Sequence, residues 1–266
     1  MSQNKTCFVT AFLDIGRDNW SYFKRSFDVY LDSFKHLASL FSCQEGNLLV
    51  AFIDSTKYEK VVKEITITSN IILIPIDETF LQAHSPLWRR LYREGEIMQS
   101  TAFATFIEHR KKCPECHEPK YTLINHAKID FIEMAISRYP SYDSFAWIDF
   151  GYFQPGIEKP RVLMNLDPLD KNKIHYTLIN PITINDQNIL YTLLYAPERI
   201  GGFFFYGGKQ ALLEYRTLYH QVHEALQLGN IVDDDQHVAL RCTFVKPELF
   251  QLHLAGGWHR VFGLFS

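Results

Sequence analysis

The sequence lacks both a large excess of charge of one sign and a long hydrophobic run. Its 266 residues include 27 basic and 30 acidic side chains, for a net charge of −3 at pH 7, which excludes a nucleic-acid binder held by bulk positive charge. No apolar stretch approaches the roughly 20 residues that span a membrane. The first residues also lack the basic and apolar segments of a secretory signal. We therefore expect a cytoplasmic protein that binds no nucleic acid, with peripheral attachment to the inner face of the membrane left open.

Cysteine is scarce, and the glycine motifs of metal-free phosphate sites are missing. Five scattered cysteines are typical of reduced thiols in the cytoplasm. Cys113, Cys116 and His117, with His109 nearby, form a candidate zinc knuckle, but a single C-x-x-C is a weak signal and an ordinary loop is the favoured alternative. The sequence has no G-x-x-x-x-G-K-[ST] loop and no G-x-G-x-x-G after a strand-like run, so a phosphate site here needs another source of positive charge.

Apolar residues are abundant, and they follow regular patterns. They make up 47% of the chain, with 15% aromatic residues, which is enough for a sizeable core and excludes a disordered chain. Four almost continuously apolar runs predict strands buried on both faces, at residues 7–14, 47–54, 70–77 and 144–149. Pro75 predicts that the third run is an edge strand. Helical spacing separates the runs, at residues 19–40, 57–65, from Pro86 through Leu91, and 125–139.

The second half of the chain has a mixed pattern. We expect strands at residues 173–179 and 189–195, a glycine-punctuated aromatic segment at 200–208, a long helix at 209–228, and a helix that begins near Val232. Alternating strands and helices in the first half predict βαβ units. The expected fold class is α/β, a single Rossmann-like domain over residues 1–266, with a central mainly parallel or mixed sheet flanked by helices.

Each of the four apolar runs ends in an aspartate, namely Asp14, Asp54, Asp77 and Asp149. Ligands of open parallel sheets bind outside the carboxyl ends of the strands, so we expect carboxylates along that edge; the alternative for each is a helix cap or turn. Asp149 lies between large apolar residues, where an unpaired carboxylate is costly. A Mg²⁺ or Mn²⁺ ion would keep it charged and would bridge it to a diphosphate, which points to a nucleoside-diphosphate substrate.

The residues from Asp233 to Gln236 form a second acidic group, either a solvated helix start or a carboxylate presented to a sugar or its acceptor. Near the C-terminus, His253 and His259 lie beside a glycine pair and are candidate metal ligands, with ordinary structural histidines as the alternative. Arg260 is a candidate for phosphate binding.

Basic and aromatic side chains complete the candidate set. Arg17 follows the first strand-like run and is placed to contact a phosphate or a base. Lys128 lies early in the helix that leads to Asp149, and its alternative is a solvated helix lysine. Trp147 and Trp258 are candidate platforms for sugar stacking, although most aromatic residues belong to the core.

Five short motifs, in order, resemble the bacterial HtrL/YibB family. They are Thr10-Ala-Phe-Leu-Asp-Ile-Gly-Arg17, Asn125-His-Ala-Lys-Ile-Asp-Phe131, Phe145-Ala-Trp-Ile-Asp-Phe-Gly151, Gly201-Gly-Phe-Phe and Asp234-Asp-Gln236. The resemblance implies a GT-A-type glycosyltransferase with a nucleotide-sugar donor (a UDP-sugar before others), a Mn²⁺ or Mg²⁺ ion, and a glycan or lipid-linked acceptor. It also implies a role in surface polysaccharide or lipopolysaccharide synthesis. Residues 1–151 would bind the nucleotide, and residues 152–266 would face the acceptor.

One departure from the GT-A pattern concerns the metal. Those enzymes usually carry Asp-x-Asp after the central strand, whereas this chain has Asp149-Phe150-Gly151, so His253 or His259 would have to complete the metal shell. Asp234 or Asp235 would act as general base on the acceptor hydroxyl if the enzyme inverts, or would position the substrate if it retains. The implied substrate contacts are Thr10, Ala11, Asp14, Arg17, Asp54, Lys128, Trp147, Gly201, Gly202, Gln236, Trp258 and Arg260.

Two other functions stay open from the sequence. A metal-dependent nucleotidyltransferase or phosphohydrolase would use the same acidic edge but would need closely spaced metal carboxylates. A non-catalytic carbohydrate-binding relative would keep the fold without the chemistry.

Overall fold

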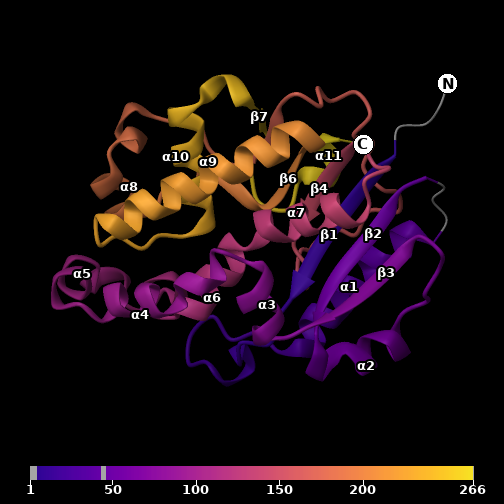
Figure 1. Ribbon diagram of the computed structural model, residues 1–266, viewed down its shortest axis with the longest axis horizontal. Helices are drawn as coiled ribbons and strands as arrows, with labels where there is room; N and C mark the ends of the chain where they lie inside the picture. Colours follow the sequence, from indigo (N-terminus) through magenta and orange to yellow (C-terminus); the bar gives the residue numbers. More distant parts are fainter. Residues whose placement is uncertain (1–4, 43–45, 266) are drawn as a thin grey trace.

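The computed structural model describes residues 5–42 and 46–265 around one seven-stranded sheet (Figure 1). The strands lie in the order β3-β2-β1-β4-β6-β5-β7. Parallel pairs join β1 to β2 and β4, β2 to β3, and β5 to β7, whereas β6 is antiparallel to both of its neighbours. The mixed sheet flanked by helices confirms the α/β fold class. In chain order, the strands are β1 (Thr6–Phe12), β2 (Leu48–Asp54), β3 (Ile71–Ile76), β4 (Ser144–Ile148), β5 (Ile174–Leu178), β6 (Ile200–Gly208) and β7 (Phe250–Leu254).

The four apolar runs of the first half are strands, as predicted. Every residue of β2 and β4 is buried, which is why their sequences do not alternate between apolar and polar side chains. β3 is the outermost strand at its end of the sheet and contains Pro75, in agreement with the predicted edge position.

The helices of the first half differ from the prediction mainly at their ends. α1 (Phe27–Phe41) begins later than residue 19, because Phe23 has a φ angle of 55° that a right-handed helix does not accommodate. Residues 13–26 instead form a loop with the short helix η1 (Arg17–Asn19). The helix predicted over residues 125–139 is two helices. The other elements here are α2 (Ser55–Glu64), α3 (Glu78–His84), η2 (Trp88–Arg90), α4 (Leu91–Gln99), α5 (Thr101–Phe106), η3 (Glu108–Arg110), η4 (Pro114–Cys116), α6 (Pro119–His126) and α7 (Lys128–Arg138).

The strand predicted at residues 189–195 is wrong, because this segment is the helix α8 (Ile189–Tyr195). It follows the short helix η5 (Ile184–Gln187), and the Asn188 side chain caps it by accepting hydrogen bonds from the backbone of Leu190 and Tyr191. Local capping therefore overrides the strand propensity of the apolar side chains. The aromatic segment at residues 200–208 is the strand β6, buried along its whole length.

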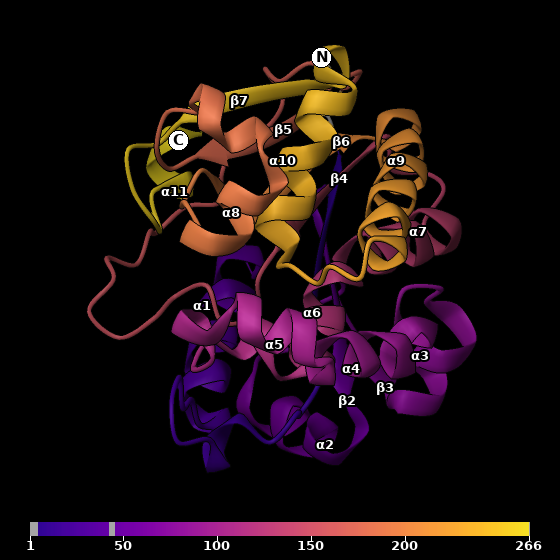
Figure 2. The same cartoon turned by 90° about the vertical axis from the view of Figure 1, so that its left-hand side faces the viewer.

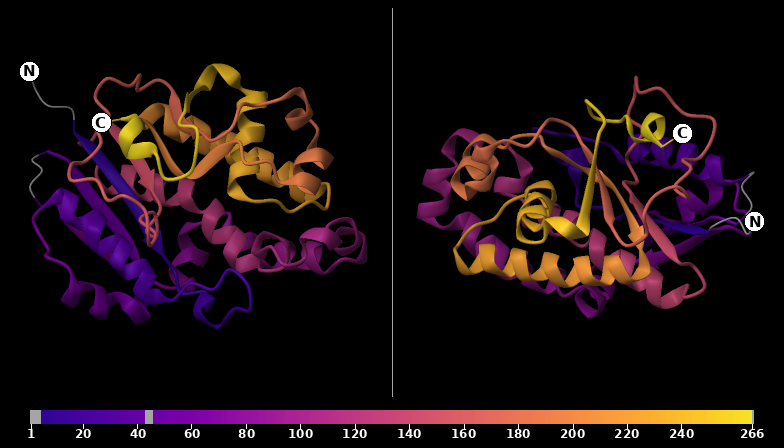
Figure 3. Two further views of the ribbon diagram at one scale, coloured as in Figure 1. Left: turned by 180° about the vertical axis from the view of Figure 1, so that it is seen from behind. Right: turned by 90° about the horizontal axis from the view of Figure 1, so that it is seen from above.

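Helices cover both faces of the sheet (Figures 1 and 3). Residues of α3, α6, α7, α9 (Lys209–Leu228) and α10 (Asp235–Val245) share one core with the sheet, and residues of α1, α2 and α11 (Val261–Leu264) share the other. The short helix η6 (Pro247–Leu249) leads into β7. α4, α5 and α8 meet at one end around a smaller apolar cluster (Figure 2). Within residues 5–42 and 46–265, no helix combines the length and apolar character that a membrane crossing requires.

Candidate functional site

A pocket of about 370 Å³ opens at the carboxyl ends of β1 and β4. From β1 the chain continues to β2 on one side, while β4 lies on the other, so this is the point at which the strand order reverses and where open α/β sheets bind ligands. The pocket is lined by the ends of β1 and β4, the loop before α1, the starts of α7 and α10, Gly202 of β6, and two C-terminal side chains, Trp258 and His259.

The loop after β1 holds an arginine in a fixed position. Arg17 donates hydrogen bonds from its two terminal nitrogens to the Tyr30 hydroxyl (2.6 Å) and to the Phe23 carbonyl (2.8 Å). Its guanidinium carbon lies 5.3 Å from the ring centre of Trp20 and 5.4 Å from that of Tyr121. The buried Nε has no hydrogen-bond partner among the described residues. A guanidinium held between aromatic rings is suited to contact a planar base or a phosphate.

The side chain of Lys128 is buried in the pocket between two carboxylates. The alternative of a solvated helix lysine is therefore wrong. Lys128 is the first residue of α7, and its side chain is 8% exposed. Its Nζ lies 2.8 Å from Asp235 Oδ2 and 3.0 Å from Asp149 Oδ1, and it donates a hydrogen bond to the carbonyl of Gly202 (2.9 Å). Trp147 Nε1 also donates to Asp149 Oδ1 (2.7 Å). One lysine thus joins the ends of β4, β6 and α10.

Burial and neighbouring charges shift the pKa values of Lys128 and Asp235. Burial lowers the pKa of Lys128, but Asp149 and Asp235 outweigh burial and raise the pKa above its usual range. Burial also raises the pKa of Asp235, and Lys128 opposes this only in part. A carboxylate with a raised pKa beside a permanent cation is suited to accept and return a proton.

Glycine at position 202 allows α10 to approach β6 at the pocket. A Cβ atom there would lie 2.5 Å from Asp235 Oδ2 and 2.9 Å from the Gln236 side chain. We expect Gly202→Ala to cost about 1–2 kcal/mol of stability and to lower ligand affinity, because Asp235 must move away from Lys128.

Urea unfolding and nucleotide calorimetry test this expectation. The matched control is Gly263→Ala in α11, where, apart from the adjacent residues and the backbone of the helix itself, no atom of the described residues lies within 4 Å of the new methyl group, so stability there stays constant or rises slightly. Equal effects of the two changes would contradict the close-approach argument.

The described residues place no group of three close metal ligands around Asp149. Carboxylate and imidazole donors of the right kind are present, since His259 lines the pocket and its buried Nδ1 has no partner among the described residues. However, groups of at least three ligand atoms within 4.8 Å of one another occur, in the described chain, only away from this pocket. Here the ammonium of Lys128 stands between the two carboxylates instead. The placed residues therefore do not fit a closed Mn²⁺ or Mg²⁺ shell, and metal dependence stays a prediction.

The structure brings together most, but not all, of the predicted site residues. The pocket lining contains Ala11, Asp14, Arg17, Lys128, Trp147, Asp149, Gly202, Asp235, Gln236, Trp258 and His259. It does not contain Thr10, Asp54, Gly201, Asp234, His253 or Arg260.

Several residues outside the lining have local structural roles. Asp54 caps α2 and accepts the backbone N–H of Asp14 (3.0 Å), and Asp234 caps α10 through the N–H of His237 (2.8 Å). His253 Nε2 lies 2.8 Å from His175 Nδ1, so it is engaged away from Asp149. Arg260 precedes α11.

The two remaining residues outside the lining are in strands. Thr10 is buried in β1. A Cβ on Gly201 would meet the Phe203 ring at 2.5 Å, so glycine there allows the Phe203 ring to pack closely.

Asp77, the third strand-end aspartate, caps α3 by accepting the N–H of Phe80 (2.7 Å).

Sequence reasoning missed several lining residues. Arg25, Tyr30 and Tyr121 line the pocket but lie in a loop and two helices without a motif of their own. Asn125 also lines the pocket, and its place at the start of the family motif at residues 125–131 was the only sequence signal for it.

The candidate zinc knuckle is not supported. His109 Nε2 is bonded to the Leu194 carbonyl (2.5 Å), and Cys113 and Cys116 join no three-ligand group among the described residues.

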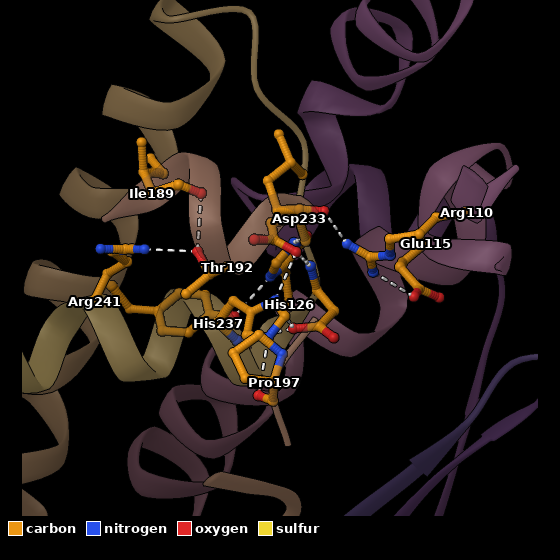
Figure 4. Close-up of polar contacts among 12 residues, drawn as sticks. Arg110, Glu115, His126, Ile189, Thr192, Pro197, Asp233, His237 and Arg241 are labelled. Atoms are coloured by element: carbon orange, nitrogen blue, oxygen red, sulfur yellow. Dashed lines mark hydrogen bonds and ion pairs between the residues drawn. The ribbon is translucent and has the colours of Figure 1, made fainter. Parts of the chain in front are cut away.

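A charged cluster stands at the start of α10 (Figure 4). His237 Nδ1 lies 2.8 Å from Asp233 Oδ1 and 3.3 Å from Asp234 Oδ1, and its Nε2 lies 3.3 Å from the Pro197 carbonyl. Burial lowers the pKa of His237, but the two carboxylates outweigh it and raise the pKa to about 10. Both ring nitrogens therefore act as donors of an imidazolium.

This cluster predicts a loss of stability at alkaline pH. The folded state binds the His237 proton more tightly than the unfolded state, whose pKa is about 6.5. The stabilisation is fully present below that value and is lost as the pH rises through about 10. We expect the free energy of unfolding, measured in urea, to fall between roughly pH 7 and pH 9, and to fall less in His237→Gln. An unchanged pH slope in the variant would contradict the assignment.

Together, fold and site define an open α/β protein whose charged pocket lies at the switch point of its sheet. The chain belongs to the family described as "Bacterial protein of unknown function (HtrL_YibB)", whose model matches residues 4–266. It is 28% identical over 281 residues to "Protein HtrL" of Escherichia coli (strain K12), covering 99% of this chain and 93% of that protein. These matches confirm the family resemblance.

A solved structure is similar at a lower level. It is titled "Crystal structure of a glycosyltransferase involved in the glycosylation of the major capsid of PBCV-1". The TM-score is 0.43 with 11% sequence identity, and the match covers 93% of this chain and 80% of that one.

Proposed function

We propose that the protein is a glycosyltransferase that moves a sugar from a nucleoside-diphosphate sugar, a UDP-sugar before others, to a glycan or lipid-linked acceptor. The observation that carries this proposal is the pocket at the switch point, where Lys128 lies within 3.0 Å of Asp149 and Asp235 and Arg17 lines the same space. Nucleotides bind at this point in open α/β sheets, and the two cations supply charge for a diphosphate.

Each part of the pocket has a role in this proposal. The loop after β1, with Asp14 and Arg17, holds the nucleotide. Lys128 neutralises the diphosphate as it leaves, because it can turn part of its hydrogen bonding from Asp149 to phosphate oxygens. Trp258 offers an aromatic face to the sugar.

Asp235 is the proposed base, in preference to its neighbour Asp234, which is engaged as a helix cap. The acceptor oxygen forms a bond to the anomeric carbon, the bond from that carbon to the diphosphate breaks, and Asp235 takes the hydroxyl proton. The products are the glycoside and the free nucleoside diphosphate. The reaction would take place in the cytoplasm, at the inner face of the membrane when the acceptor is lipid-linked, as expected for surface polysaccharide or lipopolysaccharide synthesis.

Calorimetry with UDP-, GDP- and CMP-sugars tests the proposal, each with Mn²⁺, with Mg²⁺ and with EDTA. We expect binding of a UDP- or GDP-sugar and release of the nucleoside diphosphate when an acceptor is added, whereas use of a CMP-sugar, which releases CMP, would contradict the diphosphate part of the proposal. No binding in any combination would refute the proposal. Release of inorganic phosphate or pyrophosphate would favour a hydrolase or nucleotidyltransferase. The EDTA arm decides separately whether a metal is required.

A further inference from the structure

A second group of polar side chains is buried behind the pocket, between three helices. Glu94 of α4, His126 of α6 and His223 of α9 are 0%, 1% and 2% exposed. Each offers a ligand atom that lies within 4.8 Å of a ligand atom of the other two. None of the three lines the pocket at Lys128.

Two atoms of this group are buried without a hydrogen bond. Glu94 Oε1 and His223 Nδ1 have no partner among the described residues. The other oxygen, Glu94 Oε2, accepts a hydrogen bond from Gln227 Nε2 and lies 3.8 Å from His223 Nε2. Buried polar atoms are almost always satisfied, so two unsatisfied atoms in one small cluster indicate that a partner is missing there.

One ring nitrogen of His126 makes the backbone contact that metal-binding histidines commonly make, and the other contacts Tyr219. Its Nε2 lies 3.0 Å from the backbone carbonyl of Asp233 and donates to it (Figure 4), which leaves the lone pair on Nδ1. Histidines that bind metals commonly donate their other N–H to a backbone carbonyl in this way. Nδ1 lies 2.6 Å from the Tyr219 hydroxyl, which would turn aside to release the lone pair.

We propose that Glu94, His126 and His223 bind a zinc ion. One carboxylate and two imidazoles are a ligand set that zinc accepts, and each of the three side chains offers a ligand atom within 4.8 Å of a ligand atom of the other two. Three protein ligands leave the fourth tetrahedral position to a water molecule, and the ion would hold together three side chains that are buried between helices. It would tie α4 and α9 to α6, and through His126 and the Asp233 carbonyl it would hold the start of α10, where Asp235 lies.

Metal analysis of the purified full chain, prepared without chelator or affinity metal, tests the proposal. We expect about one zinc per folded wild-type chain. Glu94→Gln and His223→Gln should each reduce the zinc content at least about tenfold. The matched control is His220→Gln, which removes an imidazole three residues earlier on the same helix; His220 contacts Asp130 instead and should leave the zinc content unchanged.

A measurement on the wild-type chain covers the case in which a variant does not fold. Zinc removal with a strong chelator should lower the Tm, and added Zn²⁺ should restore it, whereas Mg²⁺ should not. A metal-free wild-type chain whose Tm does not respond to Zn²⁺ would overturn the proposal. Zinc retained in both variants, or lost equally in His220→Gln, would also overturn it, because the ion would then be held elsewhere.

Discussion

Lys128→Met is expected to lower the free energy of unfolding by about 3 kcal/mol, because it leaves Asp235 and Asp149 facing each other with no cation between them. Methionine keeps the buried stem of the side chain, so the loss reports the charge rather than a cavity. The measurement is urea unfolding at neutral pH. Lys120→Met is the control, since Lys120 is 44% exposed and pairs with Glu78 on the surface, and it should change stability by less than about 0.5 kcal/mol.

A second variant separates charge repulsion from general disruption. Adding Asp235→Asn to Lys128→Met removes one of the two facing carboxylates, so it should recover part of the lost stability. If the double variant is no more stable than Lys128→Met alone, the ammonium is not the counter-ion of this pair.

The second large effect concerns activity. Asp235→Asn is expected to reduce sugar transfer about 10²- to 10⁴-fold, because an amide cannot accept the acceptor proton. The amide oxygen still accepts a hydrogen bond from Lys128, so nucleotide affinity should change little. Steady-state transfer assays and calorimetry measure the two quantities separately.

The neighbouring residue provides a matched control. Asn caps a helix as well as Asp does, so Asp234→Asn should keep the start of α10 and most of the activity. Strong loss in Asp234→Asn together with an active Asp235→Asn would move the base to Asp234.

The first half of the fold could be predicted because its signals are local. Continuous apolar runs mark β2 and β4, and Pro75 marks an edge, since each pattern follows from burial or a missing N–H at that position. The segment at residues 189–195 was mistaken because its apolar side chains fit either a strand or a helix. The Asn188 cap decided the outcome.

The sequence indicated which acidic residues lie at the site. It did not indicate that Lys128 forms ion pairs with them. Asp149 and Asp235 were found from their positions at the end of a strand and the start of a helix. That Lys128 joins them depends on a contact between residues 107 positions apart, Lys128 and Asp235, which no local pattern contains. The four strand-end aspartates likewise divide into pocket residues and helix caps only once the loops are placed.

The antiparallel position of β6 has a consequence for synthesis on the ribosome. β4 pairs with β1 across 138 residues, as the contact between Thr6 and Ser144 shows, and its other edge is closed only by β6, which ends at Gly208. Until that residue has emerged, the nascent chain exposes an apolar strand edge that can pair with other chains. The sheet of the first half of the chain is therefore completed only when β6, in the second half, has been synthesised.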